Sequence, residues 1–272
     1  MNQQLLWRPT ERQIADANIT GFMRRAARYS GQTLETYHDL WRWSVADVEG
    51  FWSLMWSYGS VLGDRSAGVV ADADRMPGAR WFPKATLNYA QNLLRRRDEM
   101  DALVFWGEDR VQQRVSHAVL YDAVSRCRQA LVDAGVEQGD RVAGYLPNMP
   151  EAVIAMLATA SLGAVWSSAS PDFGVEGVLD RFGQIEPKVL FCVDGYYYNG
   201  KVIDCMEKNR EAASRLPGLS RTVVVSYIAH GTDASQLFHG VGWNDFLQPF
   251  ETAEIEFVQL PFEHPLFIMF SS

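Results

Sequence analysis

Short apolar segments alternate with amphipathic helical segments between residues 141 and 226, and this alternation constrains the fold more than any other feature of the sequence. The expected strands are residues 141–146, 164–168, 188–193 and 221–226, and the expected helices are residues 151–162, 175–184 and 201–215. Neighbouring parallel strands need a crossover between them, which is usually a helix. The sequence therefore predicts an α/β fold, with a mostly parallel sheet and helices on both of its faces.

A hairpin and two capped helices are expected around this sheet. Residues 102–106 and 111–115 have the pattern of two strands joined by turn residues, which predicts a hairpin. Ser116 is expected to cap the helix that follows the hairpin. A later helix is expected to have Asn148 as its cap and Pro150 at its first position, where the missing N–H has no cost.

The last forty residues are expected to hold little regular structure before a final strand. Residues 231–240 are typical of a surface loop, residues 243–247 of a helical turn, and the apolar residues 266–270 of a strand. A sheet whose last strand is followed by only two residues would keep an open edge or face. We therefore expect the chain to be a fragment of a longer protein.

Residues 1–97 differ in composition from the rest of the chain, since six of the nine tryptophans lie at or before Trp81. Ser44 and Asp47 resemble the start of a helix. Apolar side chains then recur at three- and four-residue spacing: Val48, Phe51, Trp52, Met55 and Trp56. This pattern predicts an amphipathic helix whose aromatic face packs on other parts of the protein. We expect a helical N-terminal extension over residues 1–97, followed by the α/β part over residues 98–272.

Charge, cysteine content and hydropathy limit the partners of the chain. The 25 basic and 33 acidic residues give a net charge of −8, which provides no general field for nucleic acid or an anionic membrane, so a small-molecule partner is expected. The three cysteines have no CxxC spacing, which favours the cytoplasm. Residues 152–166 form the longest apolar stretch and are shorter than the roughly 20 residues that span a bilayer.

One segment has the spacing of a phosphate-binding loop. Residues 195–201 fit the pattern G-x-x-x-x-G-K after an expected strand, but Val202 supplies no hydroxyl for Mg²⁺, and three tyrosines lie where the backbone would wrap around phosphates. Three interpretations stay open: a P-loop nucleotide-binding module, an exposed turn, or a looser anion or cofactor contact by Tyr198, Lys201 and a helix N-terminus. The five histidines share no metal-ligand spacing, so no metal site is expected.

Longer motifs resemble a known family. Residues 139–151, 170–174 and 180–190 resemble the acyl-CoA synthetases of the adenylate-forming superfamily. Five further runs are similar to the acetoacetate-activating members of that family: residues 41–44, 51–52, 81–83, 87–93 and 166–174. The resemblance as a whole covers nearly all of the chain.

The resemblance implies that the chain is the front part of such an enzyme. Residues 1–97 would be an N-terminal extension of the acetyl-CoA synthetase type, and residues 98–272 the first part of an incomplete AMP-binding domain. Ser271 and Ser272 would begin the loop that holds the ATP phosphates. The catalytic lysine, the Mg²⁺-binding acid and the acyl pocket would lie in the missing C-terminal part, so no catalytic residue or metal ligand is expected here, and this chain alone is expected to be inactive.

The resemblance also reinterprets the loop at residues 195–201. Two arginines of related acetyl-CoA synthetases that contact the CoA phosphates match Tyr198 and Lys201, so a CoA site is expected at Gly195, Tyr196, Tyr198, Gly200 and Lys201. The implied reaction, which belongs to lipid metabolism, converts acetoacetate, MgATP and CoA to acetoacetyl-CoA, AMP and pyrophosphate through an acyl-adenylate. Acetate or propionate as the acid, and the P-loop module, remain alternatives.

Overall fold

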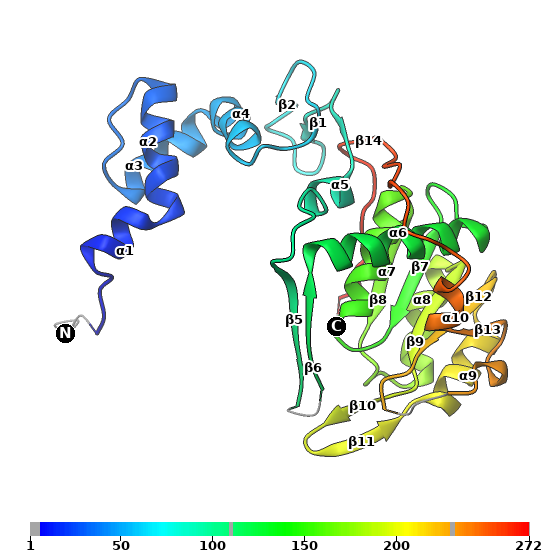
Figure 1. Cartoon of the computed structure of the whole chain (residues 1–272). Helices are drawn as coiled ribbons and strands as arrows, with labels where there is room; N and C mark the ends of the chain where they lie inside the picture. Colours follow the sequence, from blue (N-terminus) through cyan, green and yellow to red (C-terminus); the bar gives the residue numbers. More distant parts are fainter. Residues whose placement is uncertain (1–5, 109–110, 229–231, 272) are drawn as a thin grey trace. The chain divides into compact units, whose positions relative to one another are not determined.

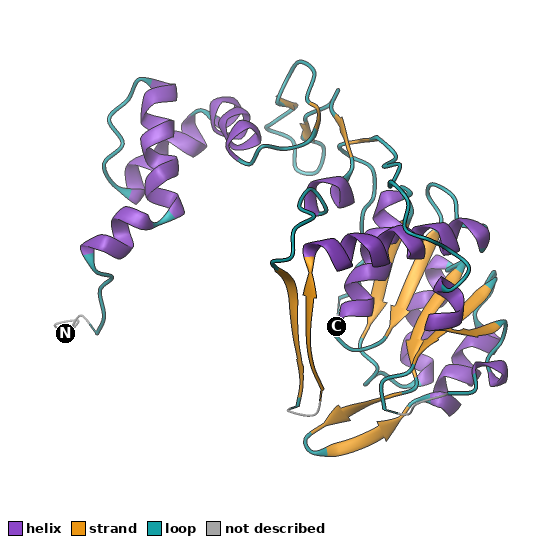
Figure 2. Ribbon diagram, in the orientation of Figure 1, coloured by secondary structure: helices purple, strands orange, loops and turns teal. Residues whose placement is uncertain are grey.

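A computed structural model describes residues 6–108, 111–228 and 232–271 of the chain (Figures 1 and 2). Its contacts divide the chain into two compact units, one that ends at Ala85 and one that begins at Thr86. Each unit is described by itself. In the described residues, no helix is long and apolar enough to cross a membrane.

The first unit is mainly helical. Its helices are α1 (Glu11–Asp16), α2 (Asn18–Ser30), α3 (Tyr37–Ala46) and α4 (Val48–Tyr58). The predicted helix over residues 48–56 is present, but Asp47 caps it by accepting the Gly50 N–H at 3.0 Å, whereas Ser44, expected at the helix start, lies within α3. The three longer helices bury a small apolar core: Phe22, Ala26, Leu34, Leu40, Trp43 and Leu54. Short strands follow: β1 (Gly63–Asp64), then β2 (Val70–Ala71) paired with β3 (Arg80–Trp81).

A five-stranded parallel sheet forms the centre of the second unit (Figure 2). Its strands are β7 (Arg141–Tyr145), β8 (Val165–Ala169), β9 (Val189–Val193), β12 (Arg221–Val225) and β13 (Gly240–Gly242). Their spatial order is β13-β12-β9-β7-β8, and every neighbouring pair is parallel. The predicted α/β class and parallel sheet are confirmed.

Helices cover both faces of this sheet because successive strand residues point to opposite sides. On β9, Val189, Phe191 and Val193 join the core beneath α6 (His117–Asp133), α7 (Pro150–Ser161) and α10 (Trp243–Leu247). The alternate residues Leu190 and Cys192 join the core beneath α8 (Val175–Ile185) and α9 (Met206–Arg215). All five strand residues are buried, as a strand covered on both faces requires.

Smaller elements surround the sheet. They are β4 (Thr86–Leu87), α5 (Tyr89–Leu93), β5 (Asp101–Gly107), β6 (Val111–Ser116), β10 (Gly195–Tyr198), β11 (Lys201–Asp204), the 3₁₀ turn Ala234–Gln236 and β14 (Leu260–Pro261). β5 and β6 form the predicted hairpin, and β10 and β11 form a second one. β14 pairs with β4.

Several predicted elements need correction. The helix expected over 201–215 begins at Met206, because residues 201–204 pair with β10 instead. Met149, with no side-chain cap bond, replaces Asn148 as the cap of α7. The expected loop ends in strand β13, and residues 266–270 form one bridge to Trp166 instead of a regular strand.

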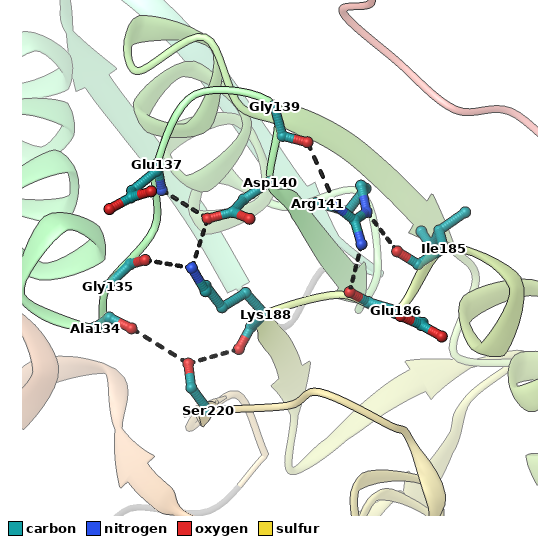
Figure 3. A network of polar contacts seen from close by, with 10 residues as sticks. All are labelled: Ala134, Gly135, Glu137, Gly139, Asp140, Arg141, Ile185, Glu186, Lys188 and Ser220. Atoms are coloured by element: carbon teal, nitrogen blue, oxygen red, sulfur yellow. Dashed lines mark hydrogen bonds and ion pairs between the residues drawn. The ribbon is translucent and has the colours of Figure 1, made fainter.

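A polar network ties the amino ends of β7, β9 and β12 together (Figure 3). Lys188 Nζ donates to Gly135 O at 2.6 Å and to Asp140 Oδ2 at 2.7 Å, and the same oxygen accepts the Glu137 N–H at 2.7 Å. Nearby, Arg141 Nε donates to Ile185 O at 2.5 Å. These contacts brace the end of the sheet at which the strands begin.

Candidate functional site

The strand order places a crevice at the opposite end of the sheet. The chain leaves β7 through α7 to reach β8 on one side, and it leaves β8 through α8 to reach β9 on the other side of β7. The two helices lie on opposite faces. In open parallel sheets, ligands bind outside the carboxyl ends of the strands at such a switch point. The carboxyl ends of β7 and β9 are therefore the first place to look for a site.

A cavity of about 760 Å³ opens at this edge, beside β8. Its walls come from the end of β7, the apolar face of α7, the second half of β8 with the turn after it, and the last apolar segment: Leu146–Asn148, Ala152, Val153, Met156, Trp166–Pro171 and Phe267–Phe270. This is the volume range of small-molecule sites, and serine hydroxyls and one asparagine amide interrupt its apolar walls. The cavity suits a ligand with both apolar and polar parts.

The last apolar segment lies along the open edge of β8. The Trp166 N–H donates to Leu266 O at 3.1 Å, the Ile268 N–H donates to Trp166 O at 2.9 Å, and the Ser167 hydroxyl donates to Ile268 O at 2.9 Å. The bridge is parallel, so this segment runs toward the carboxyl edge and brings Ser271 there. The sequence predicted Ser271 and Ser272 as the start of a phosphate loop. Ser272 lies outside the described residues.

The turn after β8 is held by side chains from three other elements. Tyr145 of β7 donates its hydroxyl to Phe173 O, Tyr196 of β10 donates to the Asp172 carboxylate, and Lys208 of α9 donates to Pro171 O. The Lys208 ammonium also lies 5.4 and 5.5 Å from the ring centres of the two tyrosines. The turn that walls the cavity is therefore fixed by residues distant in sequence.

The electrostatics of this turn follow from the same contacts. The Tyr196 hydroxyl and then the Ser170 hydroxyl, which donates at 2.8 Å, stabilise the Asp172 carboxylate and lower its pKa below the ordinary value. Burial raises the pKa of Tyr196, and the bond to Asp172 raises it further. Tyr196 thus keeps its proton and acts as a donor.

Residues 195–201 form a tight hairpin. Asn199 and Gly200 have φ angles of 50° and 73°, as in the two-residue turn that Asn-Gly favours, and Tyr198 pairs with Lys201 across the strands. Tyr198 is 61% exposed and Lys201 is also exposed, whereas Tyr196 points inward to Asp172. Tyr198 and Lys201 of the predicted CoA site therefore lie opposite each other at the outer end of this hairpin.

Gly195 has a packing role at the base of this hairpin. A Cβ added there would lie 2.2 Å from Ile228 Cδ1 and 2.5 Å from Ile203 O. Gly200, in contrast, supplies the positive φ of the turn. Because a second strand follows the turn, residues 195–201 do not form the strand–loop–helix order that a P-loop requires.

Metal-binding groups are not assembled in the part of the chain that the structure describes. Among residues 6–108, 111–228 and 232–271, no group of three or more His, Cys, Asp or Glu side chains could hold a metal ion. The site therefore offers hydrogen-bond donors, aromatic rings and the Lys201 ammonium.

Two protein-family models match this chain. Residues 91–272 match the family model of AMP-binding enzymes, and residues 37–93 match that of the acetyl-coenzyme A synthetase N-terminus. The chain belongs to the AMP-binding enzyme family. The match includes the whole parallel sheet and every element that borders the cavity.

Two similar proteins and one solved structure are acetoacetyl-CoA synthetases. Acetoacetyl-coenzyme A synthetase of Rhizobium meliloti (strain 1021) is 44% identical over 268 residues, which cover 98% of this chain and 41% of that protein. Acetoacetyl-CoA synthetase of Macaca fascicularis is 40% identical, with coverage of 99% and 41%. The solved structure of acetoacetyl-CoA synthetase from Streptomyces lividans superposes with a TM-score of 0.90 at 41% identity, with coverage of 99% and 41%. The chain spans about two fifths of the length of these relatives.

Two parts of the candidate site were absent from the sequence prediction. Lys208 gave no signal, because a lysine on an amphipathic helix is ordinary. Asp172 was noted only within a family motif. Its carboxylate accepts a hydrogen bond from Tyr196, 24 residues away, and this contact helps to hold the turn after β8. The Asn-Gly pair was the signal that could have identified the second hairpin.

Proposed function

We propose that the whole protein containing this chain is an acetoacetate–CoA ligase that forms AMP. The observation that carries the proposal is the 44% identity to an acetoacetyl-coenzyme A synthetase over 98% of this chain. The cavity and the hairpin at the carboxyl edge support it, since they are the parts of this chain that a nucleotide or coenzyme could contact.

The proposed reaction has two balanced steps. A carboxylate oxygen of acetoacetate attacks the α-phosphorus of MgATP, and the bond to the β-phosphate oxygen breaks, which gives acetoacetyl-AMP and pyrophosphate. The CoA thiolate then attacks the acyl carbon and displaces AMP, and the thiol proton passes to solvent. Mg²⁺ enters as part of the MgATP substrate, and we assign no ligand for it on this chain.

The two predicted binding regions have separate parts in the proposal. Ser271 would begin the loop around the ATP phosphates, and the backbone that wraps them would follow it. Tyr198 and Lys201 would contact CoA, with the ammonium paired to a phosphate and the phenol donating a hydrogen bond or stacking. Gly195, Tyr196 and Gly200 would shape that hairpin. This chain alone would be inactive, because the catalytic lysine, the Mg²⁺-binding acid and the acyl pocket would lie in the rest of the whole protein.

A cytoplasmic location belongs to the same proposal. Cys127, Cys192 and Cys205 are all free thiols and buried, which is consistent with a reducing compartment.

Pyrophosphate release by the whole protein tests the substrate. Acetoacetate, acetate, propionate and butyrate would be compared at equal concentration, with and without CoA. Malonamate is included because a relative from Penicillium aethiopicum, 35% identical, is named malonamoyl-CoA synthetase. We expect the highest kcat/KM for acetoacetate. A clear preference for acetate or propionate would replace the proposed acid with that alternative.

A further inference from the structure

The two hairpins at the carboxyl edge meet at Tyr227, which follows β12. Its ring lies 6.0 Å from that of Phe105 on β5 and 5.3 Å from that of Tyr197 on β10. A Cβ added to Gly107 would lie 2.1 Å from the Tyr227 hydroxyl oxygen, so the glycine allows β5 to pass this close with Tyr227 in its present place. The end of β5 is therefore fixed against the same residue that supports β10.

Glu108 extends from this fixed point to the turn of the second hairpin. Its carboxylate accepts the Asn199 N–H at 2.7 Å through Oε1 and the Gly200 N–H at 3.0 Å through Oε2. These are the two central residues of the turn, which lie between the paired positions of β10 and β11. One ionised carboxylate thus holds both, and bonds to an ionised acceptor are stronger than neutral ones.

The contacts of Glu108 help to fix the direction in which the β10–β11 hairpin points. A two-stranded ribbon has little stability or rigidity of its own. The base of β10–β11 is held by Gly195 and the inward-facing Tyr196, but its outer end carries the exposed Tyr198 and Lys201. The two bonds to Glu108 tie the turn to a residue 91 positions before Asn199 in the chain.

We propose that Glu108 is a positioning residue that fixes the β10–β11 turn and thereby places Tyr198 and Lys201 for CoA. This inference rests on the proposed function. Glu108 itself does not touch the coenzyme. It acts through the two backbone N–H groups, so its effect appears in CoA affinity and leaves the adenylation half-reaction unchanged.

The test compares Glu108→Ala and Glu108→Gln with Glu256→Ala in the whole protein. Glu256 is an exposed glutamate on the segment before β14 and serves as the matched control. We expect Glu108→Ala to raise the KM for CoA about three- to tenfold, because one or two hydrogen bonds are lost. The kcat and the KM for ATP should stay unchanged. Glu108→Gln should lie between wild type and alanine, since an amide oxygen can accept one of the two N–H groups.

Hydrogen exchange supplies a readout that does not depend on activity. The Asn199 and Gly200 amides should exchange faster in Glu108→Ala, and neither should change in Glu256→Ala. Unchanged exchange at both amides overturns the inference. The inference is also overturned if Lys201→Ala raises the KM for CoA while Glu108→Ala leaves it constant or lowers it. The turn would then be positioned without Glu108.

The two proposals fail in different ways. If Lys201→Ala leaves the KM for CoA unchanged, the proposed CoA contact is wrong. The claim that Glu108 places Lys201 for CoA then fails with it. If Lys201→Ala raises that KM and Glu108→Ala does not, the proposed function stands and the inference alone is wrong.

Discussion

Removal of the Lys188 ammonium should destabilise the protein measurably. Lys188→Met keeps most of the aliphatic stem and deletes the group that bonds Gly135 O at 2.6 Å and Asp140 Oδ2 at 2.7 Å (Figure 3). Asp140 would keep only the Glu137 N–H among these donors. The network joins the segment before β7 to the segment before β9, so its loss loosens two neighbouring strands at once.

The magnitude follows from the exposure of the pair. A hydrogen bond to a charged group contributes roughly 1.5–3 kcal/mol, and exposed ion pairs contribute about 0–1 kcal/mol. The Lys188 and Asp140 side chains are 34% and 23% exposed, between these cases. We expect a loss of about 1–2 kcal/mol in the free energy of unfolding, or about 2–8 °C in Tm for a domain of this size.

The pH dependence gives a sharper signature. Burial alone would raise the pKa of Asp140, but the hydrogen bonds from Lys188 and Glu137 outweigh it and hold the pKa below the ordinary value of 3.8. A folded pKa below the unfolded one stabilises the protein at every pH above about 4, and this contribution disappears as the pH falls through the folded pKa. The stability difference between wild type and Lys188→Met should therefore be constant from about pH 5 to 8 and shrink below about pH 4.

Urea unfolding at several pH values measures this difference. Arg210→Met is the matched control, because the Arg210–Glu207 pair is 3.9 Å apart with side chains 61% and 91% exposed, and it should change stability by less than about 0.5 kcal/mol. A Lys188→Met loss as small as that of the control, or one that persists undiminished at about pH 3, would refute the reasoning.

Three further predictions concern the carboxyl edge. In steady-state assays of the whole protein, Lys201→Ala should raise the KM for CoA about 10- to 150-fold, because a charge-assisted contact of roughly 1.5–3 kcal/mol is lost. The KM for ATP should stay nearly unchanged. Gly195→Ala should lower the stability measured by urea unfolding by about 1–3 kcal/mol through overpacking, whereas Gly183→Ala, a helix position where an added Cβ meets nothing within 4 Å, should be neutral or stabilising. Tyr196→Phe removes the principal donor to Asp172, so the pKa of that carboxyl should rise toward 3.8 in a carbon-13 NMR titration; an unchanged titration would contradict the assigned hydrogen bond.

Local patterns were sufficient for most of the fold. The β5–β6 hairpin with its turn residues, the Ser116 cap and the Pro150 start each depend on neighbouring residues, and all three agree with the structure. The parallel sheet followed from strands that alternate with helices. Strand β13 was missed because its three residues, Gly240–Gly242, are too short for a periodic signal.

The candidate site was harder to predict because its contacts are distant in sequence. The alternation of strands and helices led to an expected helix from Lys201, although Asn199 and Gly200 favour the turn that the structure contains. Tertiary contacts then decide which side chains face inward: Tyr196 points to Asp172, while Tyr198 stays exposed. No spacing rule within one segment can separate these two tyrosines, since each lies on the same short strand.

The arrangement separates the residues that brace the sheet from those that would bind ligands. Lys188 and Asp140 lie where the strands begin, whereas Lys201 lies on the hairpin that follows the end of β9. Parallel strands make this separation possible, because all their amino ends meet at one edge and all their carboxyl ends at the other. A change at Lys188 should therefore lower stability with little effect on the KM for CoA, and a change at Lys201 should do the reverse. If both properties moved together in either variant, the two edges would be coupled through the sheet.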